Sequence, residues 1–163
     1  MGSLTGSLGP ALAEIRADAS QAMSIQGSLV HGLHPELSWR FTLWVGADGR
    51  VQGHYGGRLT GQQIVGSLEE DACYLHVGGH VVGETVALRQ HGNRIDGQVR
   101  GHVRSWDVHC LVDGTHIRGY YGAGMRRQKI DIEAVDITPL LAAGLMCVAC
   151  HHFTVDYQST ADN

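Results

Sequence analysis

The stretch RVQGHY at residues 50–55 decides the fold, because its pattern returns twice more, as RIDGQV at 94–99 and HIRGYY at 116–121. In each stretch an aliphatic residue is followed two positions later by glycine and, after two more, by an aliphatic or aromatic residue. This alternation is typical of a β-strand with one apolar face. Each stretch also directly follows a glycine-containing turn, so the sequence predicts three β-hairpins.

The hairpin unit recurs about every 22 residues, because the three stretches are separated by 44 and 22 residues. A degenerate copy is expected near residue 73, where CYLHV at 73–77 resembles a strand but lacks the glycine. Further strand-like segments lie at 58–68, 80–83 and 129–135. The sequence therefore predicts a mainly β fold, an antiparallel meander of about eight or nine short strands that forms a curled sheet or a small barrel.

Two segments outside the meander predict helices. Residues 10–25 begin with proline and repeat apolar residues at helical spacing, which indicates an amphipathic N-terminal helix. Residues 139–150 have no polar face, and a helix that is apolar all round must be buried all round. We therefore expect one globular domain, with a peripheral helical segment at 1–27 and a β domain at 28–163 whose C-terminal helix, 139–152, lies in the core.

The glycines of the repeated strands lie on the apolar face, at Gly53, Gly97 and Gly119. Glycine weakens a strand, so its return at equivalent positions indicates that another stretch of backbone comes close. The apolar segment at 139–150 is the element best suited to approach a sheet in this way. We predict that the C-terminal helix packs against the sheet at these three glycines.

A β-meander followed by an apolar C-terminal helix, over roughly residues 38–152, resembles the tubby and LURP-one barrels. In those proteins a hydrophobic helix fills the barrel. The resemblance implies a barrel of twelve strands around the helix. It also implies association with phosphoinositides or membranes, which the scattered charges of this chain do not favour.

Composition excludes several classes of partner. The formal net charge is −4 and the basic residues form no block, so we expect no nucleic-acid partner. The longest apolar run, residues 140–150, is too short to span a bilayer, and we expect no transmembrane segment. We expect a cytoplasmic protein whose cysteines are free thiols: Cys73, Cys110, Cys147 and Cys150.

The chain contains one motif associated with a cofactor. Cys147, Cys150 and His151 match the C-x-x-C-H pattern of c-type haem attachment, in which two thiols bond the vinyl groups and the histidine ligates iron. Cys147 and Cys150 with His151 or His152 could instead bind zinc, with Cys73 or Cys110 completing the site. We favour a third interpretation, in which these cysteines are small apolar residues of a buried helix and no cofactor is bound.

The opposite face of the repeated strands is polar and carries the candidate binding residues. They are His54, Asp96, Arg100, His102, His116 and Arg118. Histidine, arginine and aspartate together can bind an anion or carry out general acid–base chemistry. A solvated outer face is the interpretation that we favour for most of them.

The sequence contains no nucleophile motif, no phosphate-binding glycine loop and no H-E-x-x-H motif. We therefore expect a non-enzymatic binding or assembly module that contacts another protein or a second copy of itself. Its contact surfaces would be the free edges of an incompletely closed sheet or the N-terminal helix. Two alternatives are a metal- or haem-binding protein and a small-molecule isomerase or cyclase. The latter would work in a barrel mouth, with no catalytic residue assigned.

Overall fold

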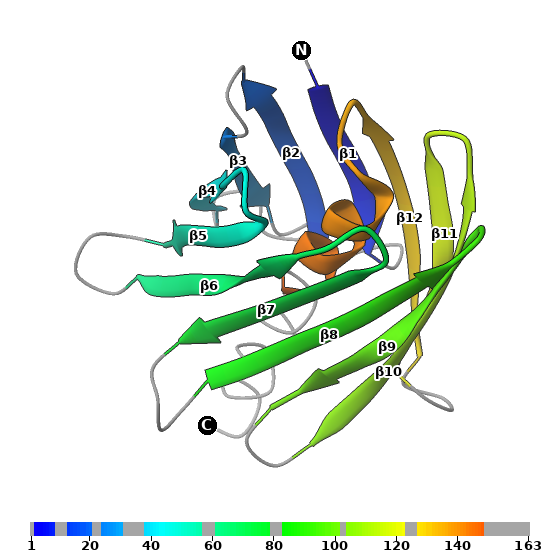
Figure 1. The fold of residues 1–163 in the computed structure, drawn as a ribbon. Helices are drawn as coiled ribbons and strands as arrows, with labels where there is room; N and C mark the ends of the chain where they lie inside the picture. Colours follow the sequence, from blue (N-terminus) through cyan, green and yellow to red (C-terminus); the bar gives the residue numbers. More distant parts are fainter. Residues whose placement is uncertain are drawn as a thin grey trace.

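Twelve antiparallel strands form a closed barrel in the computed structural model (Figure 1). The structure describes residues 2–8, 13–20, 24–30, 38–56, 61–78, 83–101, 104–122 and 127–148. The strands are β1 (Gly2–Leu8), β2 (Ala13–Ser20), β3 (Ser24–Val30), β4 (Ser38–Val45), β5 (Arg50–Tyr55), β6 (Gln62–Leu68), β7 (Ala72–Gly78), β8 (Gly83–His91), β9 (Arg94–Arg100), β10 (Ser105–Asp113), β11 (His116–Tyr121) and β12 (Gln128–Val135). Each strand pairs with its neighbours in sequence, and β1 pairs with β12 to close the sheet.

The nine strands from β4 to β12 confirm the predicted antiparallel meander. The three repeated stretches are the return strands β5, β9 and β11, and each pairs with the strand before it. Gly92 and Gly114 occupy two of the hairpin turns with φ of 61° and 60°. Glycine adopts this left-handed conformation without a steric penalty. Local turn chemistry therefore accounts for the pairing of these strands.

The prediction of an N-terminal helix was wrong. Residues 13–20 form β2 and residues 24–30 form β3, both of which belong to the barrel. The sequence AEIRADAS at 13–20 alternates apolar and polar residues at every position, which is the period of a strand. The helix prediction relied on apolar residues at helical spacing over 10–25 and did not take this alternation into account. The expected boundary between residues 27 and 28 falls inside β3.

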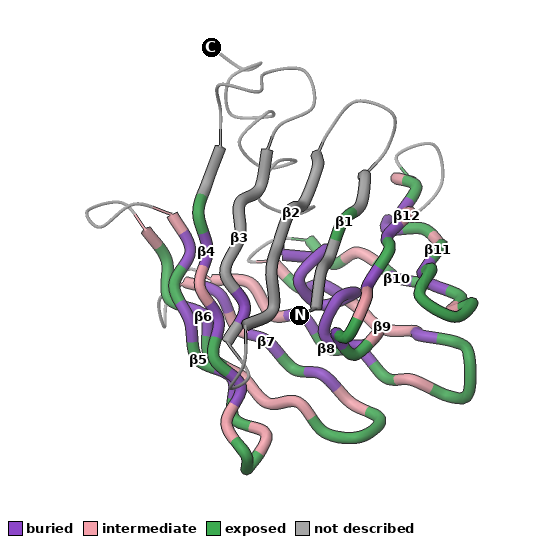
Figure 2. The backbone as a smooth tube through the Cα atoms, turned by 90° about the horizontal axis from the view of Figure 1, so that it is seen from above, coloured by how far each residue is buried: buried purple, intermediate pink, exposed green. Residues whose placement is uncertain are grey.

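Alternating burial identifies the inner face of the sheet (Figure 2). In β5 residues 51, 53 and 55 are buried, whereas residues 50, 52 and 54 are exposed. The same period appears in β7 and β10, where alternate positions are buried. The apolar face therefore lines the barrel interior and the polar face points to solvent, as the sequence predicts.

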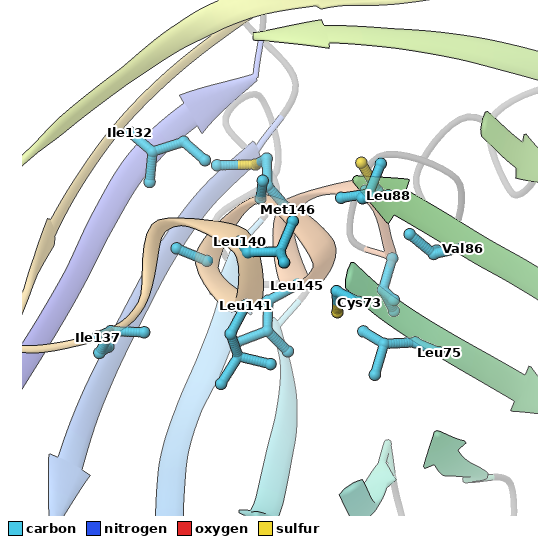
Figure 3. Close-up of a cluster of buried hydrophobic side chains, with 14 of the residues drawn as sticks. Cys73, Leu75, Val86, Leu88, Ile132, Ile137, Leu140, Leu141, Leu145 and Met146 are labelled. Carbon is cyan, nitrogen blue, oxygen red and sulfur yellow. The ribbon is translucent and has the colours of Figure 1, made fainter. Parts of the chain in front are cut away.

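The central helix, defined as residues 139–148, lies inside the barrel (Figure 1). Every residue from 140 to 148 is buried. Figure 3 shows its leucines and Met146 between Ile132 of β12 on one side and side chains of β7 and β8 on the other. This confirms the predicted buried C-terminal helix; its expected residues 149–152 lie outside the described residues.

A short turn leads the chain from β12 into the barrel. Asp136 has a φ of 55°, a left-handed conformation that aspartate tolerates better than most residues. Ile137 is buried, and the carbonyl oxygen of Thr138 accepts the backbone N–H of Ala142 at 3.0 Å. The chain therefore changes direction at Asp136 and begins the central helix immediately after Thr138.

The glycines of the repeated strands mark a close approach of backbone, but the predicted source of that backbone was wrong. A Cβ at Gly53, Gly97 or Gly119 would overlap a carbonyl oxygen of the preceding strand in the same hairpin. Those oxygens belong to Thr42, Ala87 and His109. The glycines therefore let paired strands of the barrel wall approach each other, and they are not explained by contact with the central helix.

The degenerate copy of the repeat, in β7, reverses this arrangement. Leu75 stands where the other return strands have glycine, and its cross-strand partner is Gly66 of β6. Gly144 of the central helix lies against this site. A Cβ at Gly144 would be 3.1 Å from Cys73 Sγ and 3.2 Å from Leu75 Cδ1. A leucine in the barrel wall thus meets a glycine in the helix, which places the helix next to β7.

Gly144→Leu is expected to lower the free energy of unfolding by about 1–3 kcal/mol, because the added side chain would overlap Cys73 and Leu75. Combining it with Leu75→Ala should cost less than the sum of the two single changes, since the larger side chain at 144 would fill the space vacated at 75. Urea unfolding of the three variants measures this coupling. Strictly additive losses would show that the two residues do not share space.

Gly119→Ala is expected to cost about 3 kcal/mol, because its Cβ would overlap the backbone of β10. Gly114→Ala is the matched control. Gly114 has a φ of +60° but no atom within 4 Å of its added Cβ, so only backbone strain of about 1 kcal/mol is expected. Chemical denaturation compares the two variants, and equal costs would argue against close strand packing at Gly119.

Candidate functional site

An open hollow on the outer face of the barrel, over β6 to β9, gathers the strongest candidates for binding. Its volume is about 870 Å³. Short and long side chains both line it. The short ones include Ser67, Ala72, Thr85 and Ala87, and the long ones include Tyr74, Arg89, Gln98 and Arg100. We refer to this surface as the outer hollow.

Cross-strand register explains why the outer hollow forms. Ala87 of β8 lies opposite Tyr74 of β7 and also opposite Gln98 of β9. Directly opposed residues on one face of a sheet have Cβ atoms about 5 Å apart. The methyl group of Ala87 therefore leaves a depression between two much longer side chains.

Asp96 lies at one end of the outer hollow and is held by residues of β9 and β10. His109 Nδ1 lies 2.7 Å from Asp96 Oδ1, and His109 is its cross-strand neighbour on β10. Arg94 Nε lies 3.9 Å from Asp96 Oδ2. Both carboxylate oxygens therefore have partners within the sheet.

Arg100 lies at the other end and belongs to a polar chain across β9 and β10. Its Nε and Nη2 donate to Gln98 Oε1 at 3.4 and 3.3 Å. Gln98 Nε2 in turn donates to Asp107 Oδ1 at 3.1 Å. These bonds use two of the five guanidinium N–H donors. The two bonds to the side-chain amide of Gln98, which carries no charge, fix the orientation of the Arg100 guanidinium group.

The arginines of the outer hollow have no acidic partner in the described part of the chain. Three arginines outside it do lie within 4.0 Å of a carboxylate oxygen: Arg50, Arg94 and Arg118. Among the described residues, neither Arg89 nor Arg100 has such an ion pair. The outer hollow therefore presents two guanidinium groups that form no ion pair within 4.0 Å in the described part of the chain, although Glu69 and Asp96 also line it.

The structure brings together two of the six predicted binding residues. Asp96 and Arg100 both line the outer hollow, as their shared strand and common face suggest. His102 lies outside the described residues. The other three are on different parts of the barrel.

His54 lies on the outer face of β5, in a smaller hollow of about 410 Å³ over β4 to β6. Trp44, which is 52% exposed, also lines that hollow. His116 and Arg118 are exposed on β11, two strands away from β9. Arg118 Nε lies 3.7 Å from Asp131 Oδ1, so this arginine has a partner on β12.

Sequence reasoning did not identify Tyr74, Ala87 and Arg89, which line the outer hollow. Period-two alternation along β7 and β8 could have placed all three on the outer face. Only the glycine-containing return strands were assigned faces, and these residues lie elsewhere. The contact between Asp96 and His109 depends on pairing between strands, which alternation alone does not reveal.

The cysteine motif falls only partly within the described residues. Cys147 is fully buried in the central helix, and burial raises the pKa of its thiol well above the ordinary value. Cys150 and His151 lie outside the described residues, so haem and zinc binding stay predictions. Among the residues that the structure describes, no group of three or more histidine, cysteine and acidic side chains could hold a metal ion.

Two further thiols lie in the core near the central helix. Burial raises the pKa of Cys73 to about 12. Burial, with a smaller contribution from the charge of Asp96, also raises the pKa of Cys110 to about 12. A protonated thiol is a poor nucleophile and a poor metal ligand. These two cysteines therefore act as apolar core residues near neutral pH.

Comparisons with protein families, with curated proteins and with solved structures found no match to the chain. No helix in the described ranges combines the length and the apolar character that crossing a membrane requires. The function must therefore be argued from the site itself.

The buried thiols predict a loss of stability at high pH. Their folded pKa of about 12 exceeds the ordinary 9.0, so the folded protein holds these protons more tightly than the unfolded chain. The stability that they contribute is complete below about pH 9 and falls by about 1.4 kcal/mol per thiol for each pH unit above it. Urea unfolding from about pH 8 to 10.5 measures the slope. Cys110→Ala should reduce that slope, and an unchanged slope would contradict the assignment.

Proposed function

We propose that this protein is a non-enzymatic binding module that recognises another protein through the outer hollow. The observation that carries the proposal is that the exposed Tyr74 lines the same hollow as two arginines without described ion pairs, together with short side chains such as Ala87. Tyrosine and arginine are enriched at the centres of protein–protein interfaces, because each combines a large contact area with directional hydrogen bonding. The outer hollow offers both residue types to a partner.

Core packing supports a binding site on the outside of the barrel. The central helix occupies the interior, and its residues 140–148 are buried. Core residues of the surrounding strands pack around it, including Leu75, Leu88 and Ile132. The interior therefore serves as a packed core, and the polar groups able to recognise a partner lie on the outer face.

The sequence predicts that a partner contacts free sheet edges or an N-terminal helix, whereas the present proposal places the contact at the outer hollow. Pairing of β1 with β12 closes the sheet, so β4 to β12 do not form a curled sheet with two free edges. Residues 13–20 and 24–30 are strands of the barrel and do not form an amphipathic helix. The proposed contact therefore moves to the outer surface of β6 to β9.

The two alternative functions have less support. Haem or zinc binding requires Cys150 and His151, which lie outside the described residues, together with Cys147, which is buried. An isomerase or cyclase in a barrel mouth would need its histidines to face the interior. His54 and His116 are exposed on the outer face. No observation favours either alternative over a binding module.

Site-specific photo-crosslinking tests the proposal. Benzoylphenylalanine would replace Tyr74 in one variant and Tyr120 in a matched control, because these tyrosines are similarly exposed, at 47% and 44%. In cells expressing the full chain, we expect protein adducts from position 74 and few from position 120. Tyr74→Ala should weaken binding of the captured protein about tenfold. Similar adducts from both positions, or unchanged affinity of Tyr74→Ala, would contradict the proposal.

A further inference from the structure

We infer that the outer hollow binds an extended acidic segment of a partner protein. Two carboxylates four residues apart would reach Arg89 and Arg100, and an apolar side chain midway between them would contact Tyr74 and Ala87. This inference rests on the proposed function and adds the chemistry of the partner. Three observations support it: the register of β8 and β9, the charges of the residues that line the outer hollow, and the depression at Ala87.

Strand register sets the spacing of the two arginines. Arg89 lies opposite Asp96, and Thr85 lies opposite Arg100, so the arginines are four positions apart along the paired strands β8 and β9. Strand geometry, ~3.4 Å per residue and ~4.8 Å between strands, puts their Cα atoms about 14 Å apart. An extended peptide covers about 13 Å in four residues. Its residues i, i+2 and i+4 share one face.

The surface between the arginines suits an apolar side chain. Ala87 lies midway between Thr85 and Arg89 on β8, and Tyr74 is its neighbour on β7. Tyr74 is 47% exposed, so an apolar residue against its ring would remove hydrophobic surface from water on binding. The middle position of the segment therefore favours an apolar residue and its two ends favour acidic residues.

Neither Arg89 nor Arg100 is held in an ion pair by the described residues, so each can pair with a carboxylate of a partner. Asp96 is the cross-strand neighbour of Arg89, but its oxygens lie next to His109 and Arg94. Arg100 donates to the uncharged Gln98. A carboxylate from a partner can therefore pair with either arginine without displacing an ion pair that the structure describes, and guanidinium groups bind carboxylates with two parallel hydrogen bonds.

An acidic peptide fits this surface better than a uniformly anionic one such as a membrane. The chain carries a net charge of −4, and Glu69 also lines the outer hollow. The backbone N–H of Glu69 bonds to Ala72, the residue opposite Arg89, so this carboxylate lies at the Arg89 end. A continuous negative surface would be repelled by the whole net negative charge of the chain, whereas a peptide would bring only one carboxylate near Glu69. A peptide can confine its charges to two positions.

Selection from a displayed library of random nine-residue peptides, with the full chain as target, tests the inference. We expect enrichment of peptides that have acidic residues four positions apart and an apolar residue midway. A fluorescein-labelled peptide, Gly-Glu-Thr-Phe-Thr-Glu-Gly, measures affinity by fluorescence polarisation. Arg89→Glu and Arg100→Glu should each weaken its binding about threefold to tenfold, because each exchanges an attraction for a repulsion.

Control variants separate this site from the general charge of the protein. Arg118→Glu removes an arginine outside the outer hollow and should leave the affinity unchanged. Glu69→Gln removes a negative charge from the Arg89 end and should strengthen binding about twofold. Replacing one glutamate of the peptide by lysine should restore binding to Arg89→Glu or to Arg100→Glu.

Other outcomes would overturn the inference in distinguishable ways. Enriched peptides that need Tyr74 but carry no acidic pair would reject the acidic segment and leave the proposed function intact. Absence of any peptide that depends on the outer hollow, together with no adducts from position 74, would reject both. Arginine-dependent binding to phosphatidylserine vesicles without peptide binding would assign a membrane instead. Self-association abolished by Arg89→Glu would assign a second copy of the chain.

Discussion

A barrel of twelve strands encloses more space than its own inward side chains can fill, and the central helix satisfies this constraint. Its residues 140–148 are buried, and none of them carries a polar side chain that would need a partner there. Closure of the sheet and burial of the helix depend on each other: an open sheet would leave the helix exposed to water, and an empty barrel would leave a large apolar cavity. Asp136, in a left-handed conformation, lies at the turn between the last strand and the helix.

On the inner face of the barrel, several strand pairs place a large residue directly opposite glycine. Within two hairpins a leucine lies on the outgoing strand opposite glycine on the return strand, in the pairs Leu43–Gly53 and Leu88–Gly97, and in a third hairpin the smaller Cys110 lies opposite Gly119. The hairpin of β6 and β7 exchanges the two, with Gly66 opposite Leu75. The central helix presents Gly144 to that leucine. The hairpin of β6 and β7 therefore differs from the other three hairpins. This difference gives the glycine of the central helix one matching position on the barrel wall, next to β7.

Because the central helix fills the interior, we place the proposed recognition on the outer face. The same matching of size shapes it: Ala87 opposite Tyr74 and Gln98 makes a depression, where three long side chains would have made a flat or raised surface. The ion pairs of the outer face are distributed unevenly. Asp96 is engaged by Arg94 and His109, and this leaves Arg89 without a described acidic partner. A hollow, partly aromatic surface with two arginines that have no described ion pair has thus formed on a chain whose net charge is negative.

Local pattern determined much of this protein from the sequence alone. Turn glycines and period-two alternation predicted the hairpins of β4–β5, β8–β9 and β10–β11 and their inner faces, because turn geometry and strand pleat involve only neighbouring residues. An uninterrupted apolar run predicted the buried helix in the same way. Only the tertiary structure decided that β1 pairs with β12, since Leu4 and Ala134 are distant in sequence and no local signal links them. It also decided the outer hollow: Asp96 and Arg100 were identifiable from their strand, whereas Tyr74 and Arg89 join them only through cross-strand register, which a single strand's sequence does not contain.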